Sequence, residues 1–102
     1  MIALVESKRE ELARICPLHH VRRLELFGSA SGDAFDPATS DLDFLVEFGD
    51  VPLGEYANCY FGLLEALESL FGRHVDVAEV RAIRNPYFLA SIEKTRQVLY
   101  AA

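Results

Sequence analysis

Residues 41–48 read Asp-Leu-Asp-Phe-Leu-Val-Glu-Phe, and every second side chain in this stretch is apolar. The apolar set is Leu42, Phe44, Val46 and Phe48. Because successive side chains of a β-strand point to opposite faces of a sheet, we expect a strand over Asp41–Phe48 with this set in the core. The opposite face then carries Asp41 and Asp43, whose carboxylates start about 6.5 Å apart.

Apolar spacing and the positions of Pro and Gly predict the elements on either side of this strand. Helical spacing of apolar residues indicates a helix over Leu53–Leu70, opened by Pro52 and capped by Gly72. The other expected elements are a helix over Ala3–Ile15 ended by Pro17, a strand over Val21–Phe27 broken by Gly28, a loop over Ser29–Ser40, a strand over His74–Val80, a helix from Asn85-Pro86 to about Lys94, and a last short strand over Val98–Tyr100.

This order of elements predicts the fold class. Three or four strands with interspersed helices are typical of a small α/β (α+β) domain, in which a small mixed β-sheet has helices packed on it. We expect the helices on one side of the sheet. The 102 residues fit one domain, residues 1–102, with one modest core.

The charge balance limits the classes of partner. Ten Lys and Arg against sixteen Asp and Glu give a formal net charge of −6, so general DNA or RNA binding is not expected. No stretch is long and apolar enough for a membrane span, and the N-terminus lacks the layout of a signal peptide, so we expect a cytoplasmic protein. Cys16 and Cys59 are expected to be buried as small hydrophobic residues.

Three carboxylates are candidates for a metal site. Asp76 stands between Val75 and Val77, and it would meet Asp41 and Asp43 if its strand pairs beside theirs. Converging carboxylates repel one another and raise at least one pKa, and a divalent cation removes that penalty. Carboxylate oxygens suit Mg²⁺, which also binds substrate phosphates, and two such ions can act as a pair in phosphoryl chemistry. His74, at the start of the same strand, is interpreted as a surface residue.

The Gly28-Ser29 pair follows the strand over Val21–Phe27 directly and is a candidate phosphate site. Glycine lets the backbone approach a phosphate closely, and the Ser29 hydroxyl can donate to its oxygens. Ser40 is interpreted as a turn or cap residue that can also contact substrate. Together with the acidic strands, this turn is typical of a nucleoside-triphosphate site.

These motifs resemble the minimal nucleotidyltransferases of the DNA polymerase β-like superfamily. The resemblance extends over most of the chain, including Asp76 and the segment Asn85-Pro86-Tyr87. It is carried by two runs, Phe27-Gly28-Ser29-Ala30-Ser31-Gly32-Asp33 and Ser40-Asp41-Leu42-Asp43-Phe44-Leu45-Val46-Glu47-Phe48. The fold that it implies is the nucleotidyltransferase fold, similar to the palm of polymerase β.

The resemblance also implies roles for individual residues. Gly28, Ser29 and Ser40 would bind the nucleotide, Asp41 and Asp43 would bind both Mg²⁺ ions, and Asp76 would complete the second metal site and help to activate the attacking hydroxyl. Many small members of the family are antitoxins of HEPN-domain toxins. The implied reaction is therefore Mg²⁺-dependent transfer of AMP from ATP to a hydroxyl, most simply a tyrosine of a HEPN-type toxin.

One position departs from the family pattern, which commonly has Arg where this chain has Ser31. This departure keeps one alternative open: an antitoxin of weak or no activity that neutralises its partner by binding. A further alternative, independent of Ser31, is transfer to a small-molecule hydroxyl. The cation could also come from elsewhere. The candidates are Arg22, Arg23, Arg73, Arg81, Arg84 and Lys94.

Overall fold

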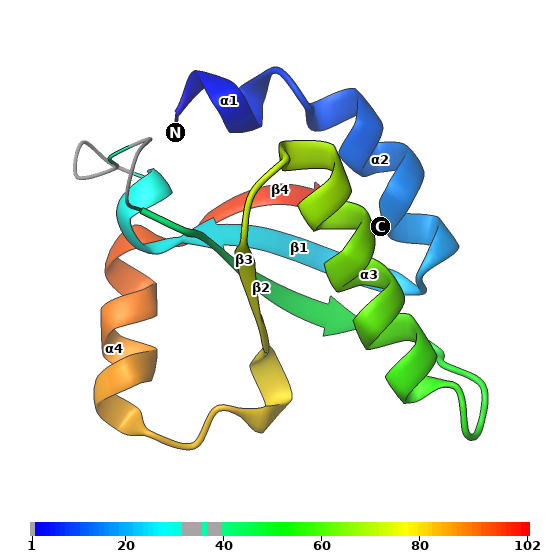
Figure 1. The fold of residues 1–102 in the computed structure, drawn as a ribbon. Coiled ribbons are helices and arrows are strands. Elements are labelled where there is room, and N and C mark those ends of the chain that lie inside the picture. Colours follow the sequence, from blue (N-terminus) through cyan, green and yellow to red (C-terminus); the bar gives the residue numbers. More distant parts are fainter. Residues whose placement is uncertain (1, 32–35, 37–39) are drawn as a thin grey trace.

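One four-stranded mixed sheet forms the centre of the molecule, as Figure 1 shows for this computed structural model, which describes residues 2–31, 36 and 40–102. The strands lie in the order β3-β2-β1-β4. Their bounds are β1 Val21–Phe27, β2 Leu42–Phe48, β3 Val75–Glu79 and β4 Gln97–Ala101. The pairs β1–β2 and β1–β4 are antiparallel and β2–β3 is parallel, so the predicted mixed sheet is confirmed.

Most of the core lies between one face of this sheet and three helices. The helix bounds are α1 Ala3–Glu6, α2 Arg9–Leu18, α3 Tyr56–Phe71 and α4 Pro86–Thr95, with short 3₁₀ turns η1 Gly28–Ser31 and η2 Val80–Ala82. Phe44 and Val46 of β2 pack in one buried cluster with Leu12 of α2 and Leu63 of α3. The alternation in residues 41–48 therefore predicts the core face of β2 correctly.

The prediction that all helices lie on one side of the sheet is wrong, because α4 packs on the opposite face. Its buried Ile92 joins a second small cluster with Phe27 and Leu45. The side chains of Phe27 and Leu45 point away from the main core. They are shielded from water because α4 packs over them. Figure 1 shows α4 and α3 on opposite sides of the strands.

The N-terminal helix also differs from its prediction. The expected helix over Ala3–Ile15 is divided into α1 and α2, and the Ser7 hydroxyl between them donates to the carbonyl of Leu4. Pro17 does not end the helix but lies inside its last turn, one residue before the end at Leu18. Proline there removes a single hydrogen bond, which is a small loss so near a helix end.

The ends of the later elements mostly follow their predicted signals. Gly72 caps α3 with φ +62° and donates its N–H to the Glu68 carbonyl, and the Asn85 side chain accepts from the first amides of α4. However, α3 begins at Tyr56 rather than Leu53, since Gly54 has φ +83° and interrupts the helix after Pro52. Of the predicted loop over Ser29–Ser40, positions 32–35 and 37–39 lie outside the described residues.

Both cysteines are buried and free, as expected. Among the described residues, none of the helices has the length and apolar character that crossing a bilayer requires.

Candidate active site

Three aspartates meet at the end of the sheet where β2 and β3 begin. Asp43 and Asp76 are each the second residue of their strand, and they are direct partners in the parallel pairing. Asp41 comes immediately before β2 and is exposed. Their apolar neighbours Leu42 and Val75 are buried in the main core, so the pleat of both strands holds the carboxylates on the opposite face.

The carboxylates influence one another strongly. Burial, the charge and hydrogen bond of Asp76, and the charge of Asp41 together raise the pKa of Asp43 to about 6. This is the repulsion that converging carboxylates produce, and a divalent cation among them would offset it.

His74 extends the cluster on the exposed side, a role that the sequence interpretation missed. Its Nε2 lies 3.1 Å from Oδ1 of Asp76 and 4.0 Å from Oδ2 of Asp41, while its Nδ1 lies 3.4 Å from Oε2 of Glu68. The hydrogen bond to Asp76, helped by the charges of Asp41 and Glu68, raises the pKa of His74. The sequence did contain a signal for this role. His74 stands two residues before Asp76, and residues two apart in an extended segment point to the same face of the sheet.

The donor atoms in this cluster suit a divalent cation. One ligand atom from each of Asp41, His74 and Asp76 lies within 4.8 Å of the other two, and Asp43 is beside them. The aspartate oxygens are hard ligands of the kind that Mg²⁺ and Mn²⁺ take, and the imidazole nitrogen is better suited to Mn²⁺. The cluster therefore offers ligands that suit Mg²⁺, with His74 in addition to the predicted aspartates, and the binding of Mg²⁺ by Asp41, Asp43 and Asp76 stays a prediction.

Gly28 makes room for one of these carboxylates. It has φ +76°, and a Cβ at this position would lie 2.6 Å from Oδ2 of Asp43. Its N–H donates to Oγ1 of Thr95 at 3.0 Å, which fastens the turn after β1 to the end of α4. We expected this glycine to let the backbone approach a phosphate; the contact that the structure shows is with Asp43.

The two predicted serines, Ser29 and Ser40, come before and after loop positions 32–35 and 37–39, which are outside the described residues. Ser29 follows Gly28 in η1 and is half-buried. The Ser40 hydroxyl accepts the N–H of Asp36 at 3.0 Å, and its own N–H donates to the Asp36 carbonyl. Ser40 therefore acts as a turn residue directly before Asp41, as interpreted; a contact with substrate stays a prediction.

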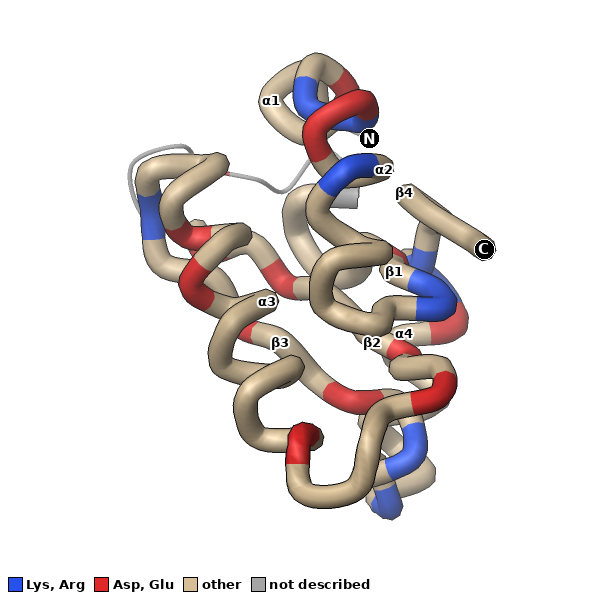
Figure 2. The backbone as a smooth tube through the Cα atoms, turned by 90° about the vertical axis from the view of Figure 1, so that its right-hand side faces the viewer, with Lys and Arg blue, Asp and Glu red and all other residues tan. Residues whose placement is uncertain are grey.

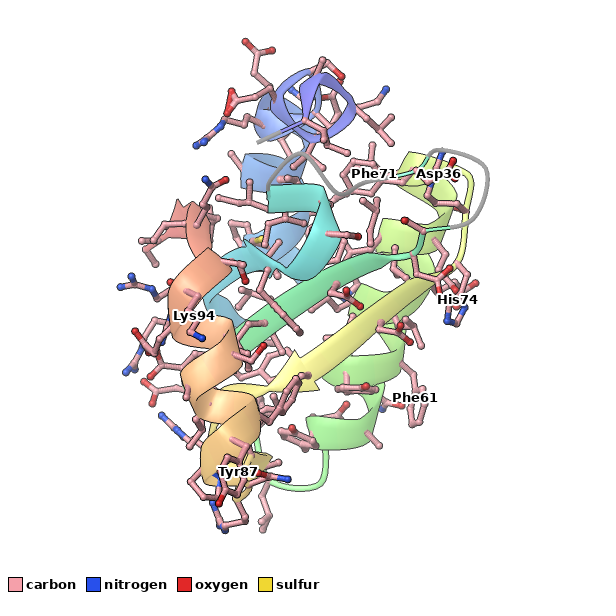
Figure 3. All side chains as sticks on the ribbon, turned by 90° about the vertical axis from the view of Figure 1, so that its left-hand side faces the viewer. Asp36, Phe61, Phe71, His74, Tyr87 and Lys94 are labelled. Carbon is pink, nitrogen blue, oxygen red and sulfur yellow. The ribbon has the colours of Figure 1, made fainter. Side chains whose placement is uncertain are left out.

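A cleft of about 490 Å³ adjoins the aspartates. Asp43, Asp76 and His74 form its polar side. Its apolar side includes Phe27 and Phe88, whose rings meet edge to face with centroids 5.9 Å apart. Figure 3 looks onto this open face of the sheet, with His74 at one edge and α4 at the other. The volume is in the range of small-molecule sites, and a nucleotide could occupy such a cleft.

Comparison with known proteins identifies the family of the chain. The family described as "Nucleotidyltransferase domain" matches residues 5–99. The chain belongs to this family. Two proteins of Methanocaldococcus jannaschii, whose names propose that they are protein adenylyltransferases, are 36% and 37% identical to this nucleotidyltransferase over 77 and 76 residues. Each alignment covers 74% of both chains.

Solved structures share the fold of this nucleotidyltransferase. One, described as a proposed minimal nucleotidyltransferase, is 28% identical with a TM-score of 0.74, covering 94% of this chain and 95% of that one. Another is the complex of a tri-AMPylated HEPN toxin of Shewanella oneidensis with its MNT antitoxin; it matches at 16% identity with a TM-score of 0.64, over 96% of this chain and 73% of that one. The predicted fold and the resemblance to minimal nucleotidyltransferases are thus confirmed.

Proposed function

We propose that this nucleotidyltransferase transfers AMP from ATP to a tyrosine hydroxyl of a HEPN-type toxin, as the antitoxin of the pair, with two Mg²⁺ ions. The observation that carries the proposal is the in-register pairing of Asp43 with Asp76, beside Asp41 and a cleft of about 490 Å³. The names of the Methanocaldococcus relatives support a protein acceptor. The toxin–antitoxin complexes with the same fold, one of them with AMP-PNP, support the partner and the nucleotide.

The three aspartates have different proposed roles in metal binding. Asp41 and Asp43 would hold both metal ions, and Asp76 would complete the second site. When bound, the ions lower the charge of the triphosphate and the pKa of the attacking hydroxyl. Ser29 and Ser40 would contact the nucleotide from the turn after β1 and from the turn before β2.

The bond changes are those of an in-line displacement. The tyrosine oxygen attacks the α-phosphorus, the bond from that phosphorus to the bridging oxygen of the β-phosphate breaks, and pyrophosphate leaves. Asp76 lies at the rim of the cleft and is exposed, so it can accept the tyrosine proton. Positioning and charge neutralisation supply most of the rate in this class of reaction.

Transfer of a radioactive label tests the proposal. The purified chain, Mg²⁺ and ATP labelled at the α-phosphate are added to a lysate of the source organism, in parallel with Asp43→Asn. We expect one labelled protein of the lysate with the native chain only, and mass spectrometry should place AMP on a tyrosine. A label that also appears with Asp43→Asn would contradict the proposal.

The alternative of neutralisation by binding alone is favoured by one observation, the Ser31 that stands where the family commonly has Arg. A double variant, Asp41→Asn with Asp43→Asn, separates the two functions in cells that express the toxin. Loss of protection by this variant supports transfer, whereas full protection supports neutralisation by contact. Label found only in small molecules would instead support a small-molecule acceptor.

A further inference from the structure

A bound triphosphate would bring negative charge to an end of the sheet that already carries three carboxylates. The chain as a whole has a net charge of −6, and Figure 2 shows Lys and Arg scattered along the backbone rather than gathered on one element. Metal ions neutralise part of a triphosphate, and Lys or Arg side chains usually bind its outer oxygens. The assignment of a residue to these outer oxygens rests on the proposed function.

The sheet topology determines which cations are near the cleft. Since β1 is antiparallel to both β2 and β4, and β2 is parallel to β3, the end of β1 and the beginnings of β2, β3 and β4 lie at one end of the sheet. Four Arg residues are at the other end. Arg22 and Arg23 lie at the start of β1, and Arg81 and Arg84 follow β3.

Arg96 and Arg73, which lie at the same end as the cleft, are engaged. Arg96 directly precedes β4 and pairs with the buried Glu25 at 2.6 Å; Glu25 also pairs with Arg23 at 3.2 Å. Arg73 is half-buried in the turn between α3 and β3 and has an interaction of its own. Lys94 differs from them, because it is exposed and, within the described part of the chain, forms no ion pair with any carboxylate.

Lys94 also lies beside the turn after β1. Its neighbour Thr95 accepts the Gly28 N–H at 3.0 Å, so the last turn of α4 is fastened next to Ser29. Ile92 anchors the same turn against the sheet. Consecutive residues of an α-helix are about 100° apart, so Lys94 is about 200° from Ile92 and projects into solvent. Figure 3 shows it on the near side of α4, in the view that looks onto the open face of the sheet.

The geometry points to Lys94 as the residue that binds the outer phosphates of the nucleoside triphosphate. Its flexible stem can bring the ammonium group over the turn at Gly28-Ser29, while the three aspartates would hold the metal ions. Lys94 is thus assigned to substrate binding, and proton transfer stays with the aspartates.

Chemical labelling tests this assignment directly, since the chain has only two lysines, Lys8 and Lys94. The probe is ATP that carries an acyl group on its γ-phosphate; a nearby lysine amine attacks the acyl carbon, an amide forms and ATP is released. We expect mass spectrometry to find Lys94 acylated, and excess ATP with Mg²⁺ to prevent it. Equal labelling of Lys8 and Lys94, without protection by ATP, would overturn the assignment.

Affinities of variants for Mg²⁺ and a non-hydrolysable ATP analogue give a second test. Loss of one charged hydrogen bond should raise the Kd of Lys94→Ala about tenfold, and Lys94→Arg should stay close to the native chain. Lys8→Ala makes the same charge change on the N-terminal side of α2 and should leave the Kd unchanged. If the native chain and Lys94→Ala bind the analogue equally well, the assignment of Lys94 is wrong but the proposed function is not contradicted. If the native chain does not bind it, the proposed function fails as well.

Discussion

At the scale of single residues, the site depends on how closely Gly28 approaches Asp43. The carboxylate occupies the space in which any other residue would place its Cβ, and the glycine has a positive φ that other residues adopt only with strain. Glycine is therefore required at position 28 for two reasons: the backbone has a positive φ, and the Asp43 carboxylate leaves no room for a Cβ.

Gly28→Ala should affect both stability and metal binding. We expect a loss of about 2 to 3 kcal/mol in the free energy of unfolding, from backbone strain and from displacement of the Asp43 carboxylate. The affinity for Mg²⁺ should fall at least about tenfold. Urea denaturation and titration calorimetry measure the two effects.

Gly54→Ala is the matched control for that variant. Gly54 has φ +83° but no atom within 4 Å of an added Cβ, so only the strain, about 1 kcal/mol, should appear. Equal Mg²⁺ affinity in Gly28→Ala and the native chain would show that the contact with Asp43 is not important for the site.

Asp43→Asn should change how stability depends on pH in the absence of metal. The folded chain binds a proton at Asp43 with a pKa of about 6, above the ordinary value of 3.8, so stability falls as pH rises from about 4 to 6. Asn removes this fall and should make the metal-free protein more stable at pH 7 by about 1 to 2 kcal/mol, allowing for solvent screening.

Thermal or urea unfolding in EDTA at several pH values checks this prediction. Asp50→Asn, at an exposed position after β2, should leave the pH dependence between 4 and 6 as in the native chain. A variant Asp43→Asn that is less stable than the native chain at pH 7 would mean that Asp43 is structural.

At the scale of elements, α4 connects the two halves of the site. It covers Phe27 and Leu45 with Ile92, lines the cleft with Phe88 and fixes Gly28 through Thr95. Its start is specified locally by the Asn85 cap, but its position on the face opposite α3 depends on apolar residues of two distant strands.

Thr95→Val should loosen this connection without changing the shape of the side chain. The Gly28 N–H loses its hydrogen bond to the Thr95 hydroxyl, which should cost about 1 to 2 kcal/mol of stability. Amide hydrogen exchange at Gly28, followed by NMR, should accelerate. Thr95→Ser keeps the hydroxyl and should preserve the slow exchange; accelerated exchange in both variants would contradict the role given to this hydrogen bond.

At the scale of the whole molecule, bound ligand should stabilise the fold. A ligand at about 100 times its Kd adds about 2.7 kcal/mol, which for a domain of this size raises Tm by roughly 10 °C. We expect this shift with Mg²⁺ and a non-hydrolysable ATP analogue together. Asp41→Asn should reduce it strongly, while Asp50→Asn should not; an undiminished shift in Asp41→Asn would exclude Asp41 from the site.

The sequence by itself was sufficient for features that depend on near neighbours. Alternation predicted β2 and its two faces, Gly72 and Asn85 predicted helix ends, and the motif around Asp41 and Asp43 indicated a family that comparison confirms. These signals are local because a strand, a cap or a turn is specified within a few residues. The roles of the site residues in metal and nucleotide binding stay predictions.

Only the tertiary structure decided how distant segments meet. The register that pairs Asp43 with Asp76, the place of α4 on the second face, the approach of His74 to Asp41 and the bond between Gly28 and Thr95 all join residues far apart in the chain. Such contacts result from packing the whole core at once, and the pattern within one segment carries no information about which other segment will cover it.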